Sequence, residues 1–573
     1  MRYTLNAREE LDLLVSELKT QRHSFESVWR DIADLASPYR LRLNLSDYNR
    51  GDRKNTRIYD STALEALDTL ESGLTTAATD PSSQWLRYTT RDPERAEFGR
   101  AKQFLETASE QFLKVCDGSG AYLSLANGYG NSALFGISAM SVEENFKGKV
   151  IHTRSFAPGS FWIGQDDEGD ANVFHREMRM TVRQLYLKMG DQGRYSSEVQ
   201  HLMDRGNWEE WVDVGHTIKP NMEYDGNRPF SEDKQWKSCW YELGSTGATG
   251  ASGYKDSLLA KDSFIREGGF DDFPIMVGRW DATEGEVYPQ DYPGIQMLGD
   301  NRSLQIGEKR GWQYIEKGVN PHWLMPQSIQ GQADDGLMPG GTTWLPSNDH
   351  QAARPLHEVD PGFLVPLEAK QQQVRKRIQT ALHYPTFSMF ATLEDKTRTA
   401  TEIMERKSEK LLKLVKMYSN LTKGVLRPFA DRVFKIMYKQ GMLGEVPKEL
   451  QGRELDYQYQ GILAQAQRMT KVQPDQAFLN TVIAVAAAKP TDPSVWDCID
   501  IDQTLQTLAS NMGVDPANMR SDEQIEALRQ ARAEQMQAAQ MAQTIPALAK
   551  SAKDLAGADM EGKNALTALV GGA

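Results

Sequence analysis

The chain has 573 residues, which is enough for about three to four compact units. Hydrophobic residues make up 39% and charged residues 25% of it, so most of the chain can bury a core and a wholly disordered protein is excluded. Its 66 basic and 79 acidic residues give a net charge of −13, which disfavours a protein that grips nucleic acid by neutralising phosphates.

The distribution of apolar and cysteine residues disfavours further classes. The longest apolar run, Val482–Ala488, is far shorter than the roughly 18 residues that a bilayer span needs. The first residues lack the apolar segment of a secretory signal, and Cys116, Cys239 and Cys498 are too scattered for a disulfide framework or a zinc site. We therefore expect synthesis in a reducing cytosol, no membrane contact, no metal and no cofactor.

Three amphipathic helices are predicted in the N-terminal region. Apolar residues recur at three- and four-residue steps over Asn6–Ala36, and Pro38 follows as a stop. A second helix begins at Thr62 and ends before the Asp80-Pro81 turn. A third, with Asp92 as cap, runs to about Gly118.

After Gly136 the pattern changes to that of strands, which we expect to form a meander. The predicted strands are Ile137–Glu143, Val150–Phe156, Phe161–Gly164, Ala171–Met180, Trp211–Ile218, Ser238–Leu243 and Ser257–Glu267, with short helices at Val182–Lys188 and Glu198–Asp204. The acidic string Asp166–Asp170 lacks the alternating ligands and closing Glu of a calcium loop, so a plain hairpin turn is favoured.

Two helices, Pro293–Val319 and Leu367–Tyr384, flank a stretch rich in Pro, Gly and Trp. An irregular insertion this long, Asn320–Pro366, is usually functional, for example as a docking surface. Four large side chains could anchor a partner, because aromatic residues and Met are enriched at interface cores: Trp323, Met325, Met338 and Trp344. A loop packed on itself is the alternative interpretation.

The strongest helical pattern covers Thr399–Gln440, with a capping box at its start and Gly441 at its end. Such a rod would be about 60 Å long, and Pro428 is expected to kink it. Its apolar stripe exceeds what a monomer needs and predicts subunit packing through Leu411, Leu414, Tyr418, Leu421 and Phe429. Beyond it we expect a strand at Leu455–Tyr459, helices at Pro474–Ala488, Asp502–Met512 and Ser521–Gln543, and a frayed tail.

The sequence contains none of the common catalytic or nucleotide-binding motifs. It has no GxxxxGK[ST] loop, HExxH pair, GxSxG elbow or CxxC pair, and its glycine-rich run Asn127–Asn131 lacks the spacing of a dinucleotide site. We therefore expect a protein that is not an enzyme. An enzyme with an unfamiliar site remains an alternative, which turnover and a small native size would reveal.

Three blocks, in order, resemble the portal proteins of short-tailed bacteriophages, the head-to-tail connector family. They are Tyr59–Leu74 followed by Pro81 and Trp85, Pro274–Trp280 followed by Gly285–Tyr288, and Arg398–Arg406. The chain departs from the family at Tyr288–Pro293, where members often read Tyr-Gly-Arg before the proline of the stem.

The resemblance implies a predominantly helical α+β portal fold with wing, stem, clip and crown, assembled as a ring of usually twelve copies. On that map the segments are the N-terminal wing 1–290, stem helix 1 at 291–319, clip 320–366, stem helix 2 at 367–384, tunnel loop and long wing helix 385–455, crown 456–543 and flexible tail 544–573. It implies a ring at one capsid vertex of the virion, assembled in the host cytoplasm, through which double-stranded DNA is packaged and ejected.

The same resemblance implies the partners: the terminase large subunit, head-tail adaptor and tail proteins, and scaffold and major capsid proteins. Candidate residues lining the DNA channel are Arg375, Lys376 and Arg377 on stem helix 2 and Lys396 and Arg398 in the segment like the tunnel loop. Ordinary solvated charges or subunit salt bridges are the alternative for each. A non-catalytic adaptor or internal scaffold protein is the alternative function, which should lack the order of stem, insertion and stem.

Overall fold

The computed structural model describes two compact units, residues 1–467 and 468–573, each considered by itself. In the first it describes 7–47, 54–90, 99–145, 149–225, 233–243, 264–326, 342–345, 354–355, 360, 362, 364–391, 414–448, 450–451 and 455–461. In the second it describes a helix at 527–537 and the single residues 482, 504 and 525. The helix falls within the predicted Ser521–Gln543, whereas the predicted helices at Pro474–Ala488 and Asp502–Met512 and the tail lie outside the described residues.

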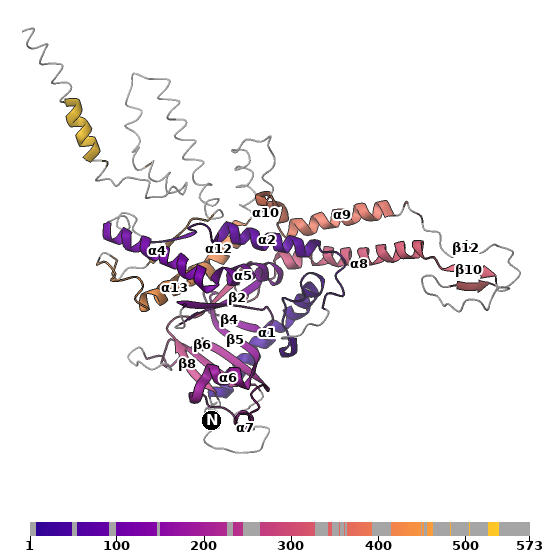
Figure 1. Cartoon of the computed structure of the whole chain (residues 1–573), viewed down its shortest axis with the longest axis horizontal. Coiled ribbons are helices and arrows are strands. Elements are labelled where there is room, and N and C mark those ends of the chain that lie inside the picture. The colour runs from indigo at the N-terminus through magenta and orange to yellow at the C-terminus, as the bar shows by residue number, and fades with distance from the viewer. Residues whose placement is uncertain are drawn as a thin grey trace, which may run out of the picture. The chain divides into compact units, whose positions relative to one another are not determined.

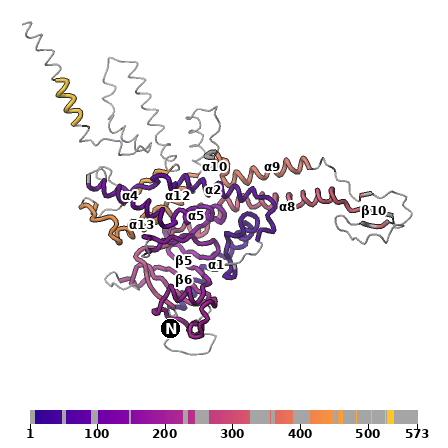
Figure 2. The backbone as a smooth tube through the Cα atoms, in the orientation of Figure 1, coloured from indigo at the N-terminus to yellow at the C-terminus, as the bar shows by residue number. Residues whose placement is uncertain are grey.

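The three predicted N-terminal helices are present, although the predicted start of the third, with Asp92 as cap, lies outside the described residues. They are α1 (Ala7–Leu35), α2 (Thr62–Ala78) and α4 (Gly99–Ser119). A further helix that was not predicted, α5 (Ala121–Phe135), follows α4 and ends at Gly136, whose backbone is in the left-handed conformation. At the start of α2, the backbone N–H of Thr62 donates a hydrogen bond to the carboxylate of Asp60. Helices α2, α4 and α5 share one layer with α13, as Figure 2 shows.

Although the first two strands predicted for the meander, Ile137–Glu143 and Val150–Phe156, belong to another sheet, a five-stranded antiparallel meander follows. Its strands are β4 (Phe161–Gln165), β5 (Ala171–Thr181), β6 (Trp211–Pro220), β7 (Trp236–Glu242) and β8 (Arg266–Phe270), with α6 (Val182–Met189) and α7 (Ser197–Asp204) between β5 and β6. The acidic string is a hairpin turn closed by Asp166 N–H donating to the Asp170 carbonyl. The last strand begins later than predicted, at Arg266, and 244–263 lie outside the described residues.

Two further sheets join segments that are distant in the sequence. Strand β2 (Ile137–Glu144) lies between β3 (Ile151–Phe156) and β9 (Ile275–Arg279). Strand β1 (Leu86–Thr90) pairs with β13 (Leu455–Tyr459) in register from Leu86↔Tyr459 to Thr90↔Leu455. Of these strands, β2, β3 and β13 were predicted from the sequence, whereas β1 and β9 were not. The pairings emerge only from the fold, because cross-strand partners carry no local signal.

The type of helix changes just before Pro428, where a kink is predicted. The chain runs from α12 (Val415–Leu421) through a π-helical segment, Thr422–Leu426, into α13 (Arg427–Lys439), and Gly441 terminates it with φ 74°. Because proline donates no N–H, the hydrogen-bonding pattern just before it is free to widen to a π turn. The predicted first part of this helix, Thr399–Lys413, lies outside the described residues.

The two predicted helices around the insertion form a hairpin, α8 (Pro293–Val319) and α9 (Leu364–Ala381), side by side in Figure 1. Helix α9 starts three residues earlier than predicted, because Pro366 falls in the first turn, where an N–H has no helical partner. It ends earlier too: His383 adopts φ 54°, and a separate helix, α10 (Tyr384–Ala391), follows.

The insertion is not wholly irregular, since it holds a small sheet of β10 (Trp323–Pro326), β11 (Thr342–Leu345) and β12 (Arg354–Pro355). The main core of the chain is one continuous cluster, and its large buried aromatic side chains include Trp29, Trp85, Tyr88, Phe112, Phe135 and Phe429. Among the helices that the structure describes, none has the length and apolarity of a bilayer span.

Candidate functional site

The base of α8 is packed tightly against the body of the chain. Gly294 lies so close to α5 that a Cβ on it would stand 2.0 Å from the Leu134 carbonyl oxygen, so only glycine fits. Tyr292, just before the helix, is buried. The hairpin is therefore anchored rigidly at its base.

Polar side chains on α8 then bind the backbone of neighbouring segments. Gln305 accepts hydrogen bonds from the N–H groups of Tyr59 and Asp60, at 2.6 and 2.9 Å, and donates to the Asp60 carbonyl at 3.0 Å. Asn301 donates to the Leu35 carbonyl at 3.0 Å. Sequence reasoning missed both residues, although two amides on an otherwise apolar helix face were the available signal.

Arg375, a candidate for the DNA channel, forms an ion-pair network inside the hairpin. Its Nε donates to Asp60 Oδ2 at 2.8 Å and its Nη2 to Glu308 Oε1 at 2.5 Å. Burial favours the neutral form of Asp60, but hydrogen bonds from Thr62 and Arg375 outweigh it and lower its pKa. Burial raises the pKa of Glu308 despite the same arginine. Both guanidinium contacts lie within this chain, and the assignment of Arg375 to the DNA channel stays a prediction.

The other described candidates for the DNA channel form fewer ion pairs than Arg375. Arg377 has a side chain 52% exposed and pairs loosely with Asp300 at 3.3 Å. Lys376 is exposed, and no ion pair holds it within the described residues. Lys396 and Arg398 lie outside the described residues. Of the three candidates that the structure describes, Lys376 and Arg377 have charged side chains exposed at the surface of the hairpin.

The small sheet brings three of the four docking candidates together. Strand β10 pairs in parallel with β11, so that Met325 stands opposite Trp344, and Trp323 is opposite Thr342 on one side and Pro355 on the other. Trp323 is 36% exposed. Met338 lies outside the described residues.

The distal half of the hairpin exposes apolar side chains that sequence reasoning overlooked. The face of α8 that carries buried Asn301 and Gln305, at steps of three and four residues, continues as Trp312, Ile315 and Val319. These three are 63%, 38% and 81% exposed. A contiguous apolar helix face in water marks a surface for protein contact.

The residues predicted to pack subunits together lie inside this chain. Leu414, Tyr418, Leu421 and Phe429 are buried in its own core, where Phe429 packs edge-on against Phe112 at 5.7 Å between ring centroids. This burial accounts for the apolar stripe without a second subunit, so subunit packing through these residues stays a prediction without support here. Leu411 lies outside the described residues.

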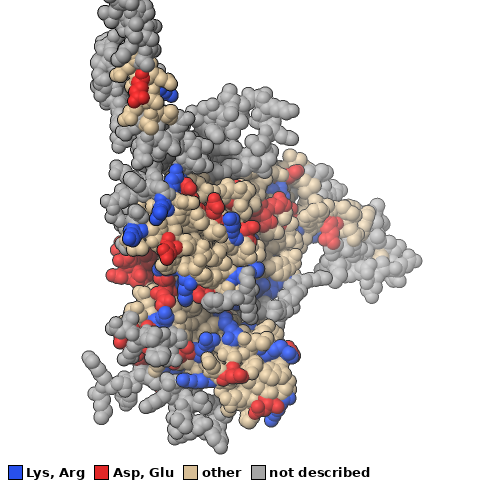
Figure 3. Space-filling model, turned by 60° about the vertical axis from the view of Figure 1, so that its left-hand side comes forward, with Lys and Arg blue, Asp and Glu red and all other residues tan. Residues whose placement is uncertain are grey.

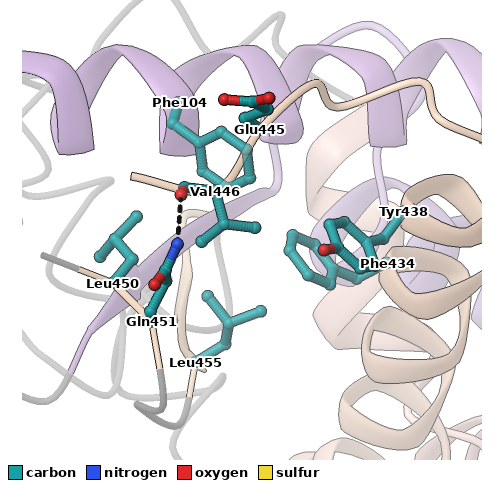
Figure 4. A pocket seen from close by; sticks show the side chains of 8 residues that line it. All are labelled: Phe104, Phe434, Tyr438, Glu445, Val446, Leu450, Gln451 and Leu455. Atoms are coloured by element: carbon teal, nitrogen blue, oxygen red, sulfur yellow. Dashed lines mark hydrogen bonds between the residues drawn. The ribbon is translucent and has the colours of Figure 1, made fainter. Parts of the chain in front are cut away.

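A cavity of about 490 Å³ lies between α4, α13 and β13 (Figure 4). Its lining is mostly apolar: Phe104, Phe434, Tyr438, Glu445, Val446, Leu450, Gln451 and Leu455. The only hydrogen bond drawn among these side chains is from Gln451 Nε2 to the Val446 carbonyl, at 3.2 Å. The residues that line this cavity include no nucleophile hydrogen-bonded to a base, so the cavity offers no candidate catalytic site.

One face of the molecule carries mixed charge, and the described residues show no metal-ligand cluster and no activated cysteine. Basic and acidic side chains are interspersed over the face in Figure 3. Within the described residues, no group of three His, Cys, Asp or Glu side chains is placed to hold a metal ion. Cys116 and Cys239 are buried, and burial raises the pKa of both thiols, which makes them poor nucleophiles.

Comparison with known proteins matches this arrangement to one family. The profile of the bacteriophage head to tail connecting proteins matches residues 8–519. The chain is 33% identical to the portal protein of Salmonella phage epsilon15 over 567 residues, covering 99% of this chain and 98% of that protein. It is 32% identical to the probable portal protein of Bordetella phage BPP-1 over 566 residues, with 97% of each covered. The chain belongs to the bacteriophage head to tail connecting protein family.

Proposed function

We propose that this protein is a phage portal, the ring at one capsid vertex through which double-stranded DNA enters and leaves. The observation that carries the proposal is similarity at 33% and 32% identity, over nearly the whole chain, to a portal protein and a probable portal protein. It is a structural component of the virion, and the family to which it belongs is not an enzyme family. Assembly takes place in the host cytoplasm.

The segments of a portal are assigned as follows. The wing comprises residues 1–290 and the part of 385–455 around α12 and α13, the stem is the α8–α9 hairpin, the clip is the insertion with β10, β11 and β12, and residues 456–543 form the crown with 544–573 as a tail. Twelve copies close the ring. The anchored base of α8 supports this assignment, because a stem must transmit load to the wing.

Neighbouring copies meet along the stem. The exposed face of Trp312, Ile315 and Val319 continues the helix stripe that is buried nearer the body. In a cyclic ring one surface of each subunit meets a different surface of the next, so an uncovered apolar face on every copy is covered by its neighbour. This face replaces the α12–α13 stripe as the candidate for subunit packing.

The charge of the ring suits a passage that does not hold DNA. Twelve copies at −13 each sum to 12 × (−13) = −156, and a channel without many phosphate contacts avoids the strong binding that counterion release gives. Lys376 and Arg377 are the described candidates for guiding the duplex. Trp323 and Trp344 of the clip sheet are candidates for docking the terminase large subunit during packaging and the adaptor and tail proteins afterwards; scaffold and major capsid proteins surround the wing.

Electron microscopy of the purified full-length protein tests the proposal. End-on class averages should show a ring with a central hole, and the native mass should be about twelve times the 64.5 kDa of one chain. A compact monomer, or a filled particle without a hole, would point instead to an adaptor or internal scaffold protein. Capsids that lack the protein should fail to fill with DNA, and normal filling would overturn the proposal.

A further inference from the structure

Basic and aromatic side chains gather at one face of the five-stranded sheet, away from the stem and clip. Arg176 of β5, His216 of β6, Trp240 of β7 and Arg266 of β8 stand directly opposite one another in successive strand pairs. Directly opposite residues in antiparallel strands share a face. Lys188 of α6 and Arg154 of β3 complete the group, which we call the basic cluster: Arg154, Arg176, Lys188 and Arg266.

Aromatic rings hold the centre of the basic cluster. The Lys188 ammonium lies 4.2 Å from the centroid of the Trp240 ring, and the Arg176 guanidinium lies 5.4 Å from the same ring and 4.9 Å from that of Phe156. His216 stacks on Trp240 at 3.9 Å. Rings fix the positions of cations through their negative faces but carry no net charge that would neutralise them.

Acidic groups are scarce around these cations. Within the described residues, Arg154, Lys188 and Arg266 are exposed and form no ion pair. Among the groups with the largest electrostatic effects on Lys188, Glu143 is the acid and the other three are arginines. Although Lys188 keeps an exposed surface, burial and then the neighbouring Arg176, Arg154 and Arg266 lower its pKa to about 8. In a chain with 79 acidic and 66 basic residues, such a concentration of positive charge is unusual.

We propose that the basic cluster is a binding site for phosphate groups, with the backbone of double-stranded DNA as their source. Three exposed cations converge from β3, α6 and β8, which suits an anion with several oxygens and more than one charge better than a single carboxylate. Trp240 is covered by Lys188 and His216, so no ring is left for a base to stack on, and contact is to the backbone without sequence preference. The DNA source, but not the phosphate chemistry, rests on the proposed portal function.

Chemical labelling of Lys188 in the full-length protein tests the site directly. At pH 8 a neutral acylating reagent should modify Lys188 readily, because a pKa of about 8 leaves roughly half of its amine unprotonated. Inorganic phosphate at about twice its dissociation constant should slow this reaction about threefold, whereas chloride at equal ionic strength should not. Phosphate that gives no protection overturns the site.

A second arm identifies the source of the phosphate. A short DNA duplex should also protect Lys188 from the reagent. The R154Q/K188Q variant should bind that duplex more weakly, and the slope of log affinity against log salt concentration should decrease by the amount expected for about two lost phosphate contacts. The control variant R183Q/R205Q removes two exposed basic charges, one on α6 and one directly after α7, and should bind as the unmodified protein does. Equal loss in both variants, or protection by an acidic peptide and not by phosphate or duplex, overturns the proposal. Ring formation, followed by microscopy, reports separately on the portal function.

Discussion

The two longest described helices, α1 and α8, treat their apolar faces differently. Along α1 the face stays covered from Leu11 to Ile32, because α1 lies on the five-stranded sheet at one end and on the main core at the other. Along α8 the face is buried up to Gln305 and exposed from Trp312 onward. The length of a helix therefore does not indicate an interface. An apolar face that continues beyond the protein's own core, and is exposed there, does.

The largest effect is expected where α1 is most buried. Trp29 is 1% exposed and packs edge-on against Phe135 and Tyr288. Trp29→Ala should lower the free energy of unfolding by about 3–5 kcal/mol, through lost burial and the cavity that remains. Denaturant unfolding followed by far-ultraviolet circular dichroism measures this change. A loss under about 1 kcal/mol would contradict the conclusion that the core covers the apolar face of α1.

The next effect concerns the polar anchor at the base of α8. Gln305→Leu leaves the N–H groups of Tyr59 and Asp60 and the Asp60 carbonyl without their side-chain partner. Buried unpaired groups are costly, so we expect a loss of about 2–3 kcal/mol. Ser303→Ala, on the exposed side of the same helix, is the control and should change stability by less than about 0.5 kcal/mol. Equal effects of both changes would show that the amide is not an anchor.

Acid should weaken the sheet that α1 covers. Arg176 Nε donates to His216 Nδ1 at 3.2 Å, so the imidazole is neutral and its Nε2–H donates to Ser238 Oγ at 3.0 Å. Burial, then Arg176 and Lys188, hold the pKa of His216 well below its usual value. The unfolded chain takes up this proton near pH 6.5 and the folded chain does not, so stability is full above pH 6.5 and falls below it by about 1.4 kcal/mol per pH unit.

Thermal unfolding between pH 7 and pH 5 measures this loss, and His216→Gln should flatten the dependence. The buried His175 shifts in the same direction, because burial lowers its pKa against the pull of Glu177, so part of the slope should persist in the variant. Identical slopes in both proteins would contradict the assignment to His216.

The smallest effect on folding is expected at the exposed end of α8. Trp312→Ser removes a side chain that is 63% exposed and should change the stability of the subunit by less than about 0.5 kcal/mol. Ring formation, however, should decrease strongly, as sedimentation or mass photometry would show. Unchanged rings would remove the proposed contact, whereas a large loss of stability would show that α8 is covered within its own chain.

Much of the fold could be predicted from the sequence, because periodicity and caps are local signals. The ends of α1, α8 and the meander strands agree with expectation to within a few residues, apart from the late start of β8. The pairing of β1 with β13 and of β2 with β9 could not be predicted, since it depends on residues far apart in the chain. The π-helical segment was missed because a proline signals a disturbed helix but not which hydrogen-bonding pattern replaces it.

The candidate site was harder to predict than the fold. A basic residue on a helix looks the same in sequence whether it faces solvent or, like Arg375, closes an internal network with Asp60 and Glu308. An apolar stripe likewise looks the same whether its own chain covers it, as at Phe429, or leaves it bare, as at Trp312. Burial is a property of the folded chain, which is why the sequence alone does not distinguish these cases.

The π-helical segment adjusts the register of everything that follows it. Leu421, Val425, Phe429 and Val433 are spaced by four residues three times in succession, yet all four are buried, because the wider turn absorbs the surplus residue. At its centre Gly424 lies so close to β9 that a Cβ would stand 2.4 Å from the Val277 carbonyl oxygen. Deleting one residue from 422–426 would restore ordinary helical bonding but swing Val433 and its successors about 100° out of the core, so a repair of local geometry would undo the global packing.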